Sequence, residues 1–184
     1  MLKKNNKGFS MIELIVVVAI LIVATGVTIG SFRTAYNARS YQAAKTIDVL
    51  ISQSKVNAMS GRRNALCIKY DEAKKCYLCS LYYLDSANHT TGEPYEQQEV
   101  GNSSLKIIVN NEDLKENNFE LRLIYNMDTG AVKMLAYSTN FDGGSSQTNM
   151  LGVHTTNKSA TIQLQSYSNH SITIYKSTGQ HTFS

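Results

Sequence analysis

The sequence contains three cysteines, the side chains best suited to redox or metal chemistry. Cys76 and Cys79 have the spacing of a thiol–disulfide exchange motif. Such a motif needs a helix start to lower the thiol pKa, whereas this pair lies at the beginning of a β-like run that continues through residues 77–84. A zinc site would need a fourth ligand, and two cysteines three apart on one strand point to opposite faces. The sequence therefore favours neither a catalytic thiol nor a metal site.

A structural role is the better interpretation of these cysteines. A hairpin turn at residues 71–74 would bring Cys67 opposite the strand that carries Cys76 and Cys79. After export, Cys67 could form a disulfide with either Cys76 or Cys79. The choice depends on a strand register that the sequence leaves open. Three free thiols are the alternative if the organism is strictly anaerobic.

Other candidate catalytic residues are scattered. The four histidines, His89, His154, His170 and His181, lie in polar segments without metal-ligand spacing, so we predict surface histidines. The sequence has no nucleophile elbow, phosphate-binding loop or paired catalytic carboxylates. We therefore expect a protein that is not an enzyme and that needs no cofactor or metal.

The charge distribution argues against a general nucleic-acid binder. The formal charge is +4, and Lys3, Lys4 and Lys7 supply most of it, because the rest of the chain has 15 basic and 14 acidic residues. A nucleic-acid-binding domain usually carries a broad basic footprint. DNA is therefore a partner that the sequence allows but does not favour.

The first 60 residues predict one long helix with two different halves. Residues 9–30 are mostly apolar and number 22, whereas a membrane-spanning helix needs about 20. From Phe32 to Ala58, apolar residues recur at spacings of three, four and seven, which is the pattern of one helix face. Gly61 favours the left-handed conformation that ends many helices. We expect an apolar anchor half followed by an amphipathic half.

The remainder of the chain predicts a mainly antiparallel β-sheet domain, so the fold class is α+β with the helix packed on the sheet. Seven runs rich in Ile, Val, Leu and Tyr predict strands at residues 65–70, 77–84, 105–109, 119–125, 131–137, 161–167 and 172–175. Two long polar stretches, 85–104 and 138–159, predict loops.

One acidic residue, Glu13, lies just inside the apolar N-terminal stretch. A carboxylate in a membrane-inserting segment costs about 2.5–3.5 kcal/mol at its centre and less near its edge. A cleaved secretory signal would explain the basic start and the apolar core, but not this acid. A plain signal anchor does not explain it either.

The segment KGFSMIEL at residues 7–14 resembles the processing site of type IV prepilins and pseudopilins. The resemblance implies that residues 1–8 form a basic leader that prepilin peptidase cleaves after Gly8. It also implies that Phe9 becomes the N-methylated N-terminus and that Glu13 sets the register of filament assembly.

The resemblance has departures. Ser10 and Met11 stand where threonine and leucine are commoner in the family, and Gly30 stands where many major pilins have a proline.

The same resemblance implies an order of segments. Residues 9–31 would form the helix in the membrane and filament core, residues 32–61 the amphipathic half-helix, and residues 62–184 the β-rich globular domain. The protein would be a single-pass cell membrane protein with an extracytoplasmic C-terminal domain, and later part of a cell-surface or periplasmic filament. Its implied partners are prepilin peptidase, other pilin or pseudopilin subunits, the inner-membrane assembly platform and the lipid bilayer.

Elementary electrostatics explains why such a filament would need Glu13. Cleavage creates a charged amine on Phe9, and an unpaired ammonium or carboxylate is costly in a lipid-like core. Glu13 of an incoming subunit can neutralise the Phe9 amine of its neighbour, whereas a misplaced subunit leaves both charges alone. Breaking a buried pair in this way costs about 3–5 kcal/mol.

Two weaker resemblances indicate a subgroup of the type IV prepilin and pseudopilin family. Residues 50–59 with the following strand look similar to H-type minor pseudopilins, and so do residues 172–175 with Thr178-Gly179 near the C-terminus. We therefore expect a minor subunit of a type IV pilus, a type II secretion pseudopilus or a DNA-uptake filament. The alternatives are a DNA-binding or adhesive tip pilin and a membrane-anchored thiol-redox protein.

Overall fold

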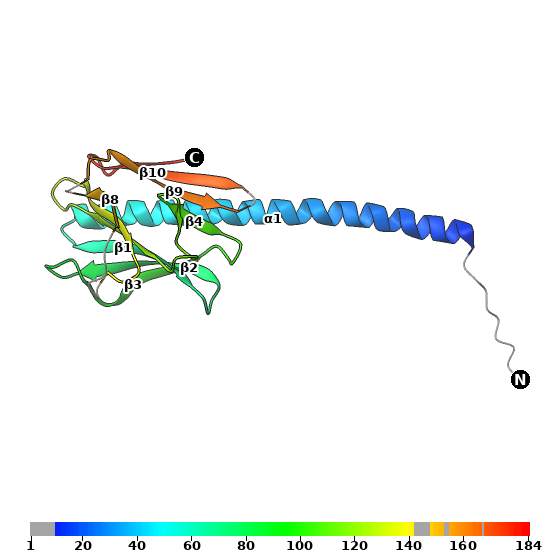
Figure 1. Ribbon diagram of the computed structural model, residues 1–184, viewed down its shortest axis with the longest axis horizontal. Coiled ribbons are helices and arrows are strands. Elements are labelled where there is room, and N and C mark those ends of the chain that lie inside the picture. Colours follow the sequence, from blue (N-terminus) through cyan, green and yellow to red (C-terminus); the bar gives the residue numbers. More distant parts are fainter. Residues whose placement is uncertain (1–9, 142–147, 153–154, 167) are drawn as a thin grey trace, which may run out of the picture. The chain divides into compact units, whose positions relative to one another are not determined.

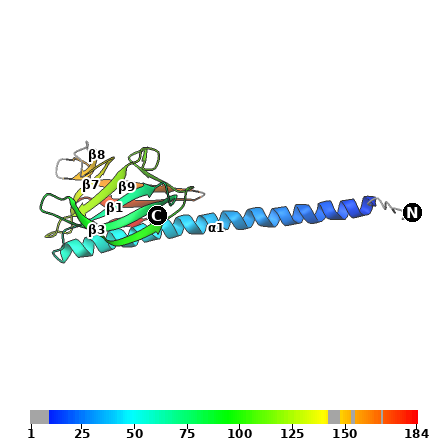
Figure 2. The same cartoon turned by 90° about the horizontal axis from the view of Figure 1, so that it is seen from below.

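The structure is a computed structural model that describes residues 10–141, 148–152, 155–166 and 168–184. The chain divides into two compact units, residues 1–36 and residues 37–184. Helix α1 (Met11–Met59) contributes its first part to the first unit and its second part to the second. All the strands belong to the second unit, where they lie beside the end of α1 in both views (Figures 1 and 2).

Helix α1 ends in a local hydrogen-bonded cap. The N–H of Gly61 donates to the Ala58 carbonyl at 2.9 Å, and the N–H of Arg62 donates to the Asn57 carbonyl at 3.1 Å. These two bonds form a Schellman motif. Gly61 has a φ of 83°, a conformation that residues with a Cβ rarely adopt. The predicted helix stop at Gly61 is therefore confirmed.

Within the described residues, eleven strands form two antiparallel sheets (Figure 1). The larger sheet has the order β3-β2-β1-β6-β7-β8 and the smaller one the order β11-β10-β9-β4-β5. The strands are β1 (Asn64–Asp71), β2 (Cys76–Leu84), β3 (Thr90–Val100), β4 (Lys106–Val109), β5 (Glu112–Asp113), β6 (Glu120–Tyr125), β7 (Val132–Ser138), β8 (Thr148–Gly152), β9 (Ser159–Gln165), β10 (Asn169–Tyr175) and β11 (His181–Phe183).

The broad fold class, α+β with an N-terminal helix and a mainly antiparallel β-domain, is confirmed. The seven predicted strands correspond to β1, β2, β4, β6, β7, β9 and β10. The predicted hairpin turn between β1 and β2 is also present. There the Asp71 carboxylate accepts hydrogen bonds from the N–H groups of Ala73 at 2.8 Å and Lys74 at 3.2 Å, which fixes the turn locally.

The two polar stretches predicted as loops both contain strands. Residues 85–104 include β3, and residues 138–159 include β8. Each is an edge strand of the larger sheet, and most side chains of β3 are partly or fully exposed. Pro94, which has no N–H to donate, is tolerated at such an edge. The loop prediction is wrong for these segments because an exposed edge strand does not need alternating apolar residues.

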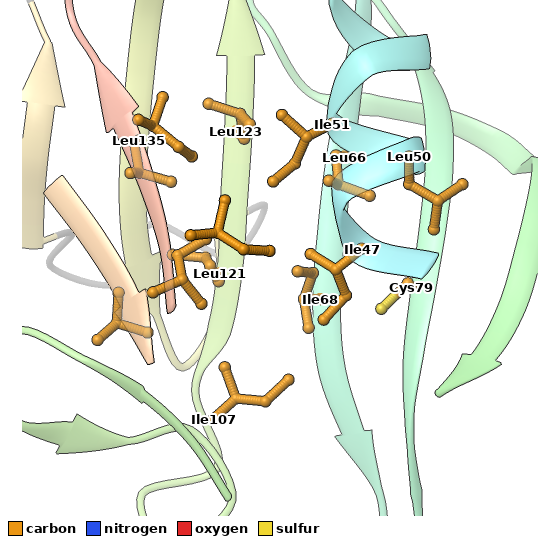
Figure 3. Close-up of a cluster of buried hydrophobic side chains, with 14 of the residues drawn as sticks. Ile47, Leu50, Ile51, Leu66, Ile68, Cys79, Ile107, Leu121, Leu123 and Leu135 are labelled. Atoms are coloured by element: carbon orange, nitrogen blue, oxygen red, sulfur yellow. The ribbon is translucent and has the colours of Figure 1, made fainter. Parts of the chain in front are cut away.

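The main core lies between α1 and the two sheets (Figure 3). Ile47, Leu50 and Ile51 of the helix are at most 1% exposed, and each contributes about 1.5–3 kcal/mol by burial. The sheet residues in this cluster include Leu66, Ile68, Cys79, Ile107, Leu121, Leu123 and Leu135. The predicted amphipathic face is thus confirmed for this part of the helix, while the side chain of Phe32 lies outside the described part.

Strand β1 is buried on both faces. Leu66 points into the main core, whereas Ala65 and Cys67 belong to a second apolar cluster with Leu84 and Ile124. Successive side chains of a strand point to opposite faces, so the larger sheet carries apolar residues on both sides at β1. Leu84 and Ile124 of this second cluster line a cavity described below.

Candidate assembly site at the start of the helix

Ser10 and Glu13 form two reciprocal hydrogen bonds at the first turn of α1. The backbone N–H of Ser10 donates to Glu13 Oε2 at 2.8 Å, and the backbone N–H of Glu13 donates to Ser10 Oγ at 3.2 Å. This reciprocal arrangement is a capping box, which satisfies donors that a helix start leaves unpaired. Ser10 was not among the predicted site residues, although serine followed three residues later by glutamate before an apolar run signals such a box.

The apolar side chains that surround Glu13 and follow it are exposed. The large hydrophobic residues between Met11 and Val23 have exposed fractions from 47% to 81%. A helix that is apolar all round is normally buried in a protein core or a membrane. Exposing apolar surface to water costs roughly 25 cal/mol of free energy per Å². The first part of α1 therefore has the surface of a segment that needs apolar surroundings.

The other predicted site residues of the N-terminus, Gly8 and Phe9, lie outside the described residues. Their cleavage and methylation stay predictions. The position of Glu13 in the first turn of the helix is nevertheless fixed by Ser10, because the capping box places its carboxylate at the N-terminal end of α1.

The part of α1 in the second unit is tied to the C-terminal strand. Asp48 Oδ1 lies 2.9 Å from Nε2 of His181 in β11, and Asp48 Oδ2 lies 2.8 Å from Nζ of Lys45. Only 13% of the His181 side chain is exposed, so the prediction of a free surface histidine is wrong for this residue. The sequence did not predict the pair of Asp48 and His181, because these residues are far apart along the chain. His154 lies outside the described residues.

The three cysteines are free thiols, and the register of β1 with β2 explains why. Cys67 lies opposite Ser80, while Cys79 lies opposite Ile68, so Cys67 and Cys79 are on opposite faces of the sheet. Cys76 shares the face of Cys67, but it pairs with the end of β1, four residues away. At about 3.4 Å per residue, that separation exceeds the Cα–Cα limit of about 7 Å for a disulfide. Both predicted pairings of Cys67, with Cys76 or with Cys79, are therefore wrong in this structure.

These thiols are also poorly placed for redox chemistry. Burial raises the pKa of the Cys67 thiol well above its usual range and does the same for Cys79. The reactive species of a thiol is the thiolate, which such burial disfavours. Among the described residues, no group of three or more His, Cys, Asp or Glu side chains could hold a metal ion.

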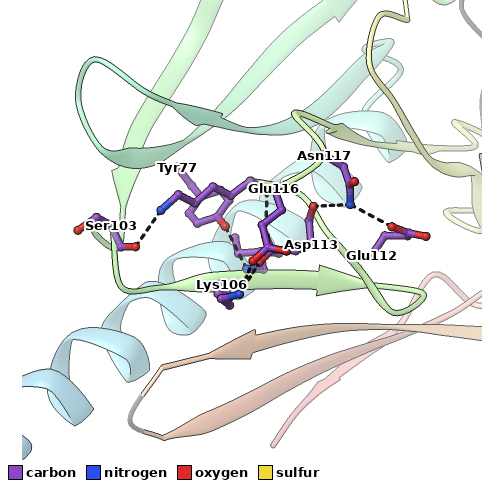
Figure 4. Close-up of polar contacts among 9 residues, drawn as sticks. Tyr77, Ser103, Lys106, Glu112, Asp113, Glu116 and Asn117 are labelled. Carbon is purple, nitrogen blue, oxygen red and sulfur yellow. Dashed lines mark hydrogen bonds and ion pairs between the residues drawn. The ribbon is translucent and has the colours of Figure 1, made fainter.

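A polar cluster connects β4 to the residues around β5 (Figure 4). Nζ of Lys106 lies 2.5 Å from Glu116 Oε1 and 3.4 Å from Asp113 Oδ2. Nearby, the Tyr77 hydroxyl accepts the N–H of Ile107 at 3.1 Å, and burial raises the pKa of Tyr77. The Lys106–Glu116 pair is exposed, and such pairs contribute only about 0–1 kcal/mol, whereas the Asp113 carboxylate is buried. We assign this cluster the structural role of holding the residues after β5 against β4.

The fold and the helix start together define a class: a small α+β protein whose N-terminal helix begins with a capped glutamate and exposes apolar side chains. Residues 3–29 match the family model described as the prokaryotic N-terminal methylation motif. The chain therefore carries the signal motif of type IV prepilin-like proteins, and the predicted resemblance is confirmed.

In the part of the chain that the structure describes, none of the helical stretches is both long and apolar enough to cross a membrane. No curated protein and no solved structure matches the chain. The family motif is thus the finding that relates this chain to known proteins, and it covers the N-terminal segment alone.

Proposed function

We propose that this chain is a structural subunit of a type IV pilin-like filament and not an enzyme. The observation that carries the proposal is the start of α1, where the capped Glu13 is followed by exposed apolar side chains up to Val23. Such a surface is stable in lipid or against other apolar helices. A filament subunit meets both environments, the bilayer before assembly and neighbouring helices afterwards.

The precursor in this proposal is a single-pass cell membrane protein whose second unit lies outside the cytoplasm. Prepilin peptidase cleaves after Gly8, where the missing side chain lets the protease approach the backbone. Phe9 then becomes the methylated N-terminus. The methylation motif at residues 3–29 supports this step. The inner-membrane assembly platform then transfers the subunit into a pilus, a type II secretion pseudopilus or a DNA-uptake filament.

Glu13 changes its partner during this process. In the single chain, its carboxylate accepts the Ser10 N–H at the N-terminal end of α1. In a filament core, the ammonium of Phe9 from a neighbouring subunit needs a counter-charge, because an unpaired charge is costly in a dry environment. The capping box supports this role, since it orders the carboxylate at the end of the helix that carries the amine.

Two substitutions separate the capping role of Glu13 from its charge. Glu13→Gln keeps the capping box, because glutamine can replace glutamate there, but it removes the charge. Ser10→Ala removes the cap and keeps the charge. We expect both variants to lose the leader normally, because the scissile bond lies upstream. Glu13→Gln should lower the ratio of filament-associated to membrane-associated protein at least about tenfold, whereas Ser10→Ala should lower it less than about threefold.

Cleavage is scored in the same samples by mass spectrometry, with Gly8→Val as the uncleaved control. An intact leader on the wild-type protein would overturn the proposed function. Normal incorporation of Glu13→Gln would instead overturn only the role of Glu13, and it would assign the register to apolar packing. The charge-preserving Glu13→Asp should give an intermediate ratio, because its carboxylate is one methylene shorter.

We further infer that the subunit is a minor one, similar to H-type pseudopilins. The resemblance at residues 50–59 and at Thr178-Gly179 supports this choice, and so do the long polar stretches that contain β3 and β8. Counting copies relative to other pilins in sheared filaments tests it. A copy number equal to that of the most abundant pilin would make this chain a major subunit.

The rival functions differ in measurable ways. A membrane-anchored thiol-redox protein should reduce insulin disulfides, which the buried thiols of Cys67 and Cys79 disfavour. A DNA-binding tip pilin should bind duplex DNA with a steep salt dependence. An adhesive tip pilin should carry a ligand site on the second unit.

A further inference from the structure

A cavity of about 170 Å³ lies in the second unit where four strands of the larger sheet begin or end. Its floor includes Leu84 at the end of β2 and Ile124 near the end of β6, which are 8% and 4% exposed. Its rim carries the side chains of Arg63, Lys133 and Asp128. The cavity therefore combines an apolar floor with a charged rim, which is the usual composition of a small-molecule site.

Hydrogen bonds hold the walls of this cavity in place. In the turn that carries Asn88, Asp85 Oδ1 accepts the N–H groups of two following residues at 2.8 Å each. Lys133 Nζ donates to Asn88 Oδ1 at 2.9 Å and so joins two walls. On a third side, Asn126 Oδ1 accepts the N–H of Asp128 at 2.8 Å. The site is therefore preformed, which lowers the entropic cost of binding.

The two cations of the rim keep donors for a ligand, because Lys133 Nζ gives one of its three N–H groups to Asn88. Among the described residues, no carboxylate lies within ion-pair distance of Arg63 or Lys133. The planar guanidinium of an arginine can bind a carboxylate through two parallel hydrogen bonds. The cavity is smaller than the roughly 300–1,000 Å³ of sites for drug-sized ligands, so its size suits a single ring or a short chemical group.

We propose that this cavity binds one uronic acid unit of an acidic polysaccharide, that is, a sugar ring that carries a carboxylate. The carboxylate pairs with Arg63 and Lys133, and the apolar face of the ring lies on the floor. The sugar hydroxyls bond to the Asn126 amide and donate to the Asp128 carboxylate. This inference goes beyond filament assembly, because no residue of the helix start takes part, and such a site on the second unit is what the adhesive tip pilin alternative would carry.

The rim favours such a sugar over the phosphodiester backbone of DNA. Two cations and one carboxylate give the rim a net charge of only +1, whereas tight DNA binding needs several phosphate contacts. A carboxylate such as that of Asp128 repels phosphate but accepts hydrogen bonds from sugar hydroxyls. Binding of DNA through this cavity would therefore contradict the proposal.

Adjacent arginines provide a matched test. Arg62 and Arg63 are both exposed, but Arg63 lines the cavity and Arg62 does not. We suggest isothermal titration of the full-length protein in detergent with oligogalacturonate and with a glucuronate-containing oligosaccharide. At least one should bind with a Kd of about 1 mM or tighter. Arg63→Gln should weaken that binding at least about tenfold, and Arg62→Gln less than about twofold.

The methyl ester of the bound oligosaccharide serves as the control ligand, because it keeps the sugar rings and removes the charge. It should bind at least about tenfold more weakly than the acid. Circular dichroism confirms that each variant is folded. The proposal is overturned if neither acidic oligosaccharide binds, if the methyl ester binds equally well, or if both arginine variants lose binding equally. It is also overturned if a DNA duplex competes and Arg63→Gln abolishes DNA binding.

Discussion

Gly179, in the turn between β10 and β11, provides a sharp test of how the second unit is packed. It has a φ of 59°, and a Cβ built on it would lie 1.9 Å from the Gly130 carbonyl oxygen and 2.9 Å from Cε1 of Tyr125. Gly130 itself belongs to the turn before β7, where its N–H donates to the Asn126 carbonyl at 2.9 Å. The turns on the two sheets are thus in direct contact and leave no room for a methyl group.

The cost of Gly179→Ala has two parts. The left-handed backbone conformation costs an alanine about 1–2 kcal/mol. An ordinary carbon–oxygen contact is about 3.3 Å or longer, so the two turns must separate by more than about 1 Å. Overpacking of this kind costs about 1–3 kcal/mol. We expect the free energy of unfolding to fall by about 2–5 kcal/mol in total, which is a large share of the 5–15 kcal/mol typical of a domain.

Gly92 in β3 is the matched control. Its φ is 64°, but no heavy atom lies within 4 Å of a Cβ built on it. Gly92→Ala should therefore lose only the backbone part, about 1–2 kcal/mol. The measurement is urea denaturation of the full-length protein in detergent, followed by near-ultraviolet circular dichroism of the tyrosines. Equal losses for the two variants would refute the close contact between the turns.

Three further predictions concern the core, the C-terminal strand and pH. Ile47→Ala, at a fully buried position, should lower the free energy of unfolding by about 2–5 kcal/mol. Val49→Ala, on the exposed side of the helix, should change it by less than about 0.5 kcal/mol. Urea denaturation measures both. Asp48→Asn should speed hydrogen exchange of the β11 amides, because His181 loses its charged partner; unchanged exchange would show that the pair does not hold β11. Burial raises the pKa of the Cys79 thiol, so above about pH 8.5 the unfolded chain loses a proton that the folded state keeps. The free energy of unfolding should then fall as the pH rises. Cys79→Ala should reduce the slope of this fall by up to about 1.4 kcal/mol per pH unit. An identical pH dependence in this variant would exclude the contribution of the thiol.

Local features of this protein were predictable from the sequence alone. The helix stop at Gly61 follows from the conformational freedom of glycine, and the N-terminal motif follows from residues that are adjacent in the chain. The capping box of Ser10 and Glu13 was equally local and was readable from their spacing. In each case the physical cause acts within about one helical turn, so no distant residue is needed to establish it.

The tertiary structure decided what depends on register and on distant partners. Cys67 faces away from Cys79 because β1 and β2 pair in one register, and a shift by one residue would reverse the face. Strand β3 forms because the edge of β2 offers it backbone hydrogen bonds, a stabilisation that its polar side chains do not reveal. The pair of Asp48 and His181 likewise joins segments whose proximity depends on the packing of the whole second unit. The pattern of apolar and polar side chains indicates which residues are buried. Strand register and edge pairing depend on backbone N–H and C=O groups, which are the same at nearly every residue and so leave no mark in the sequence.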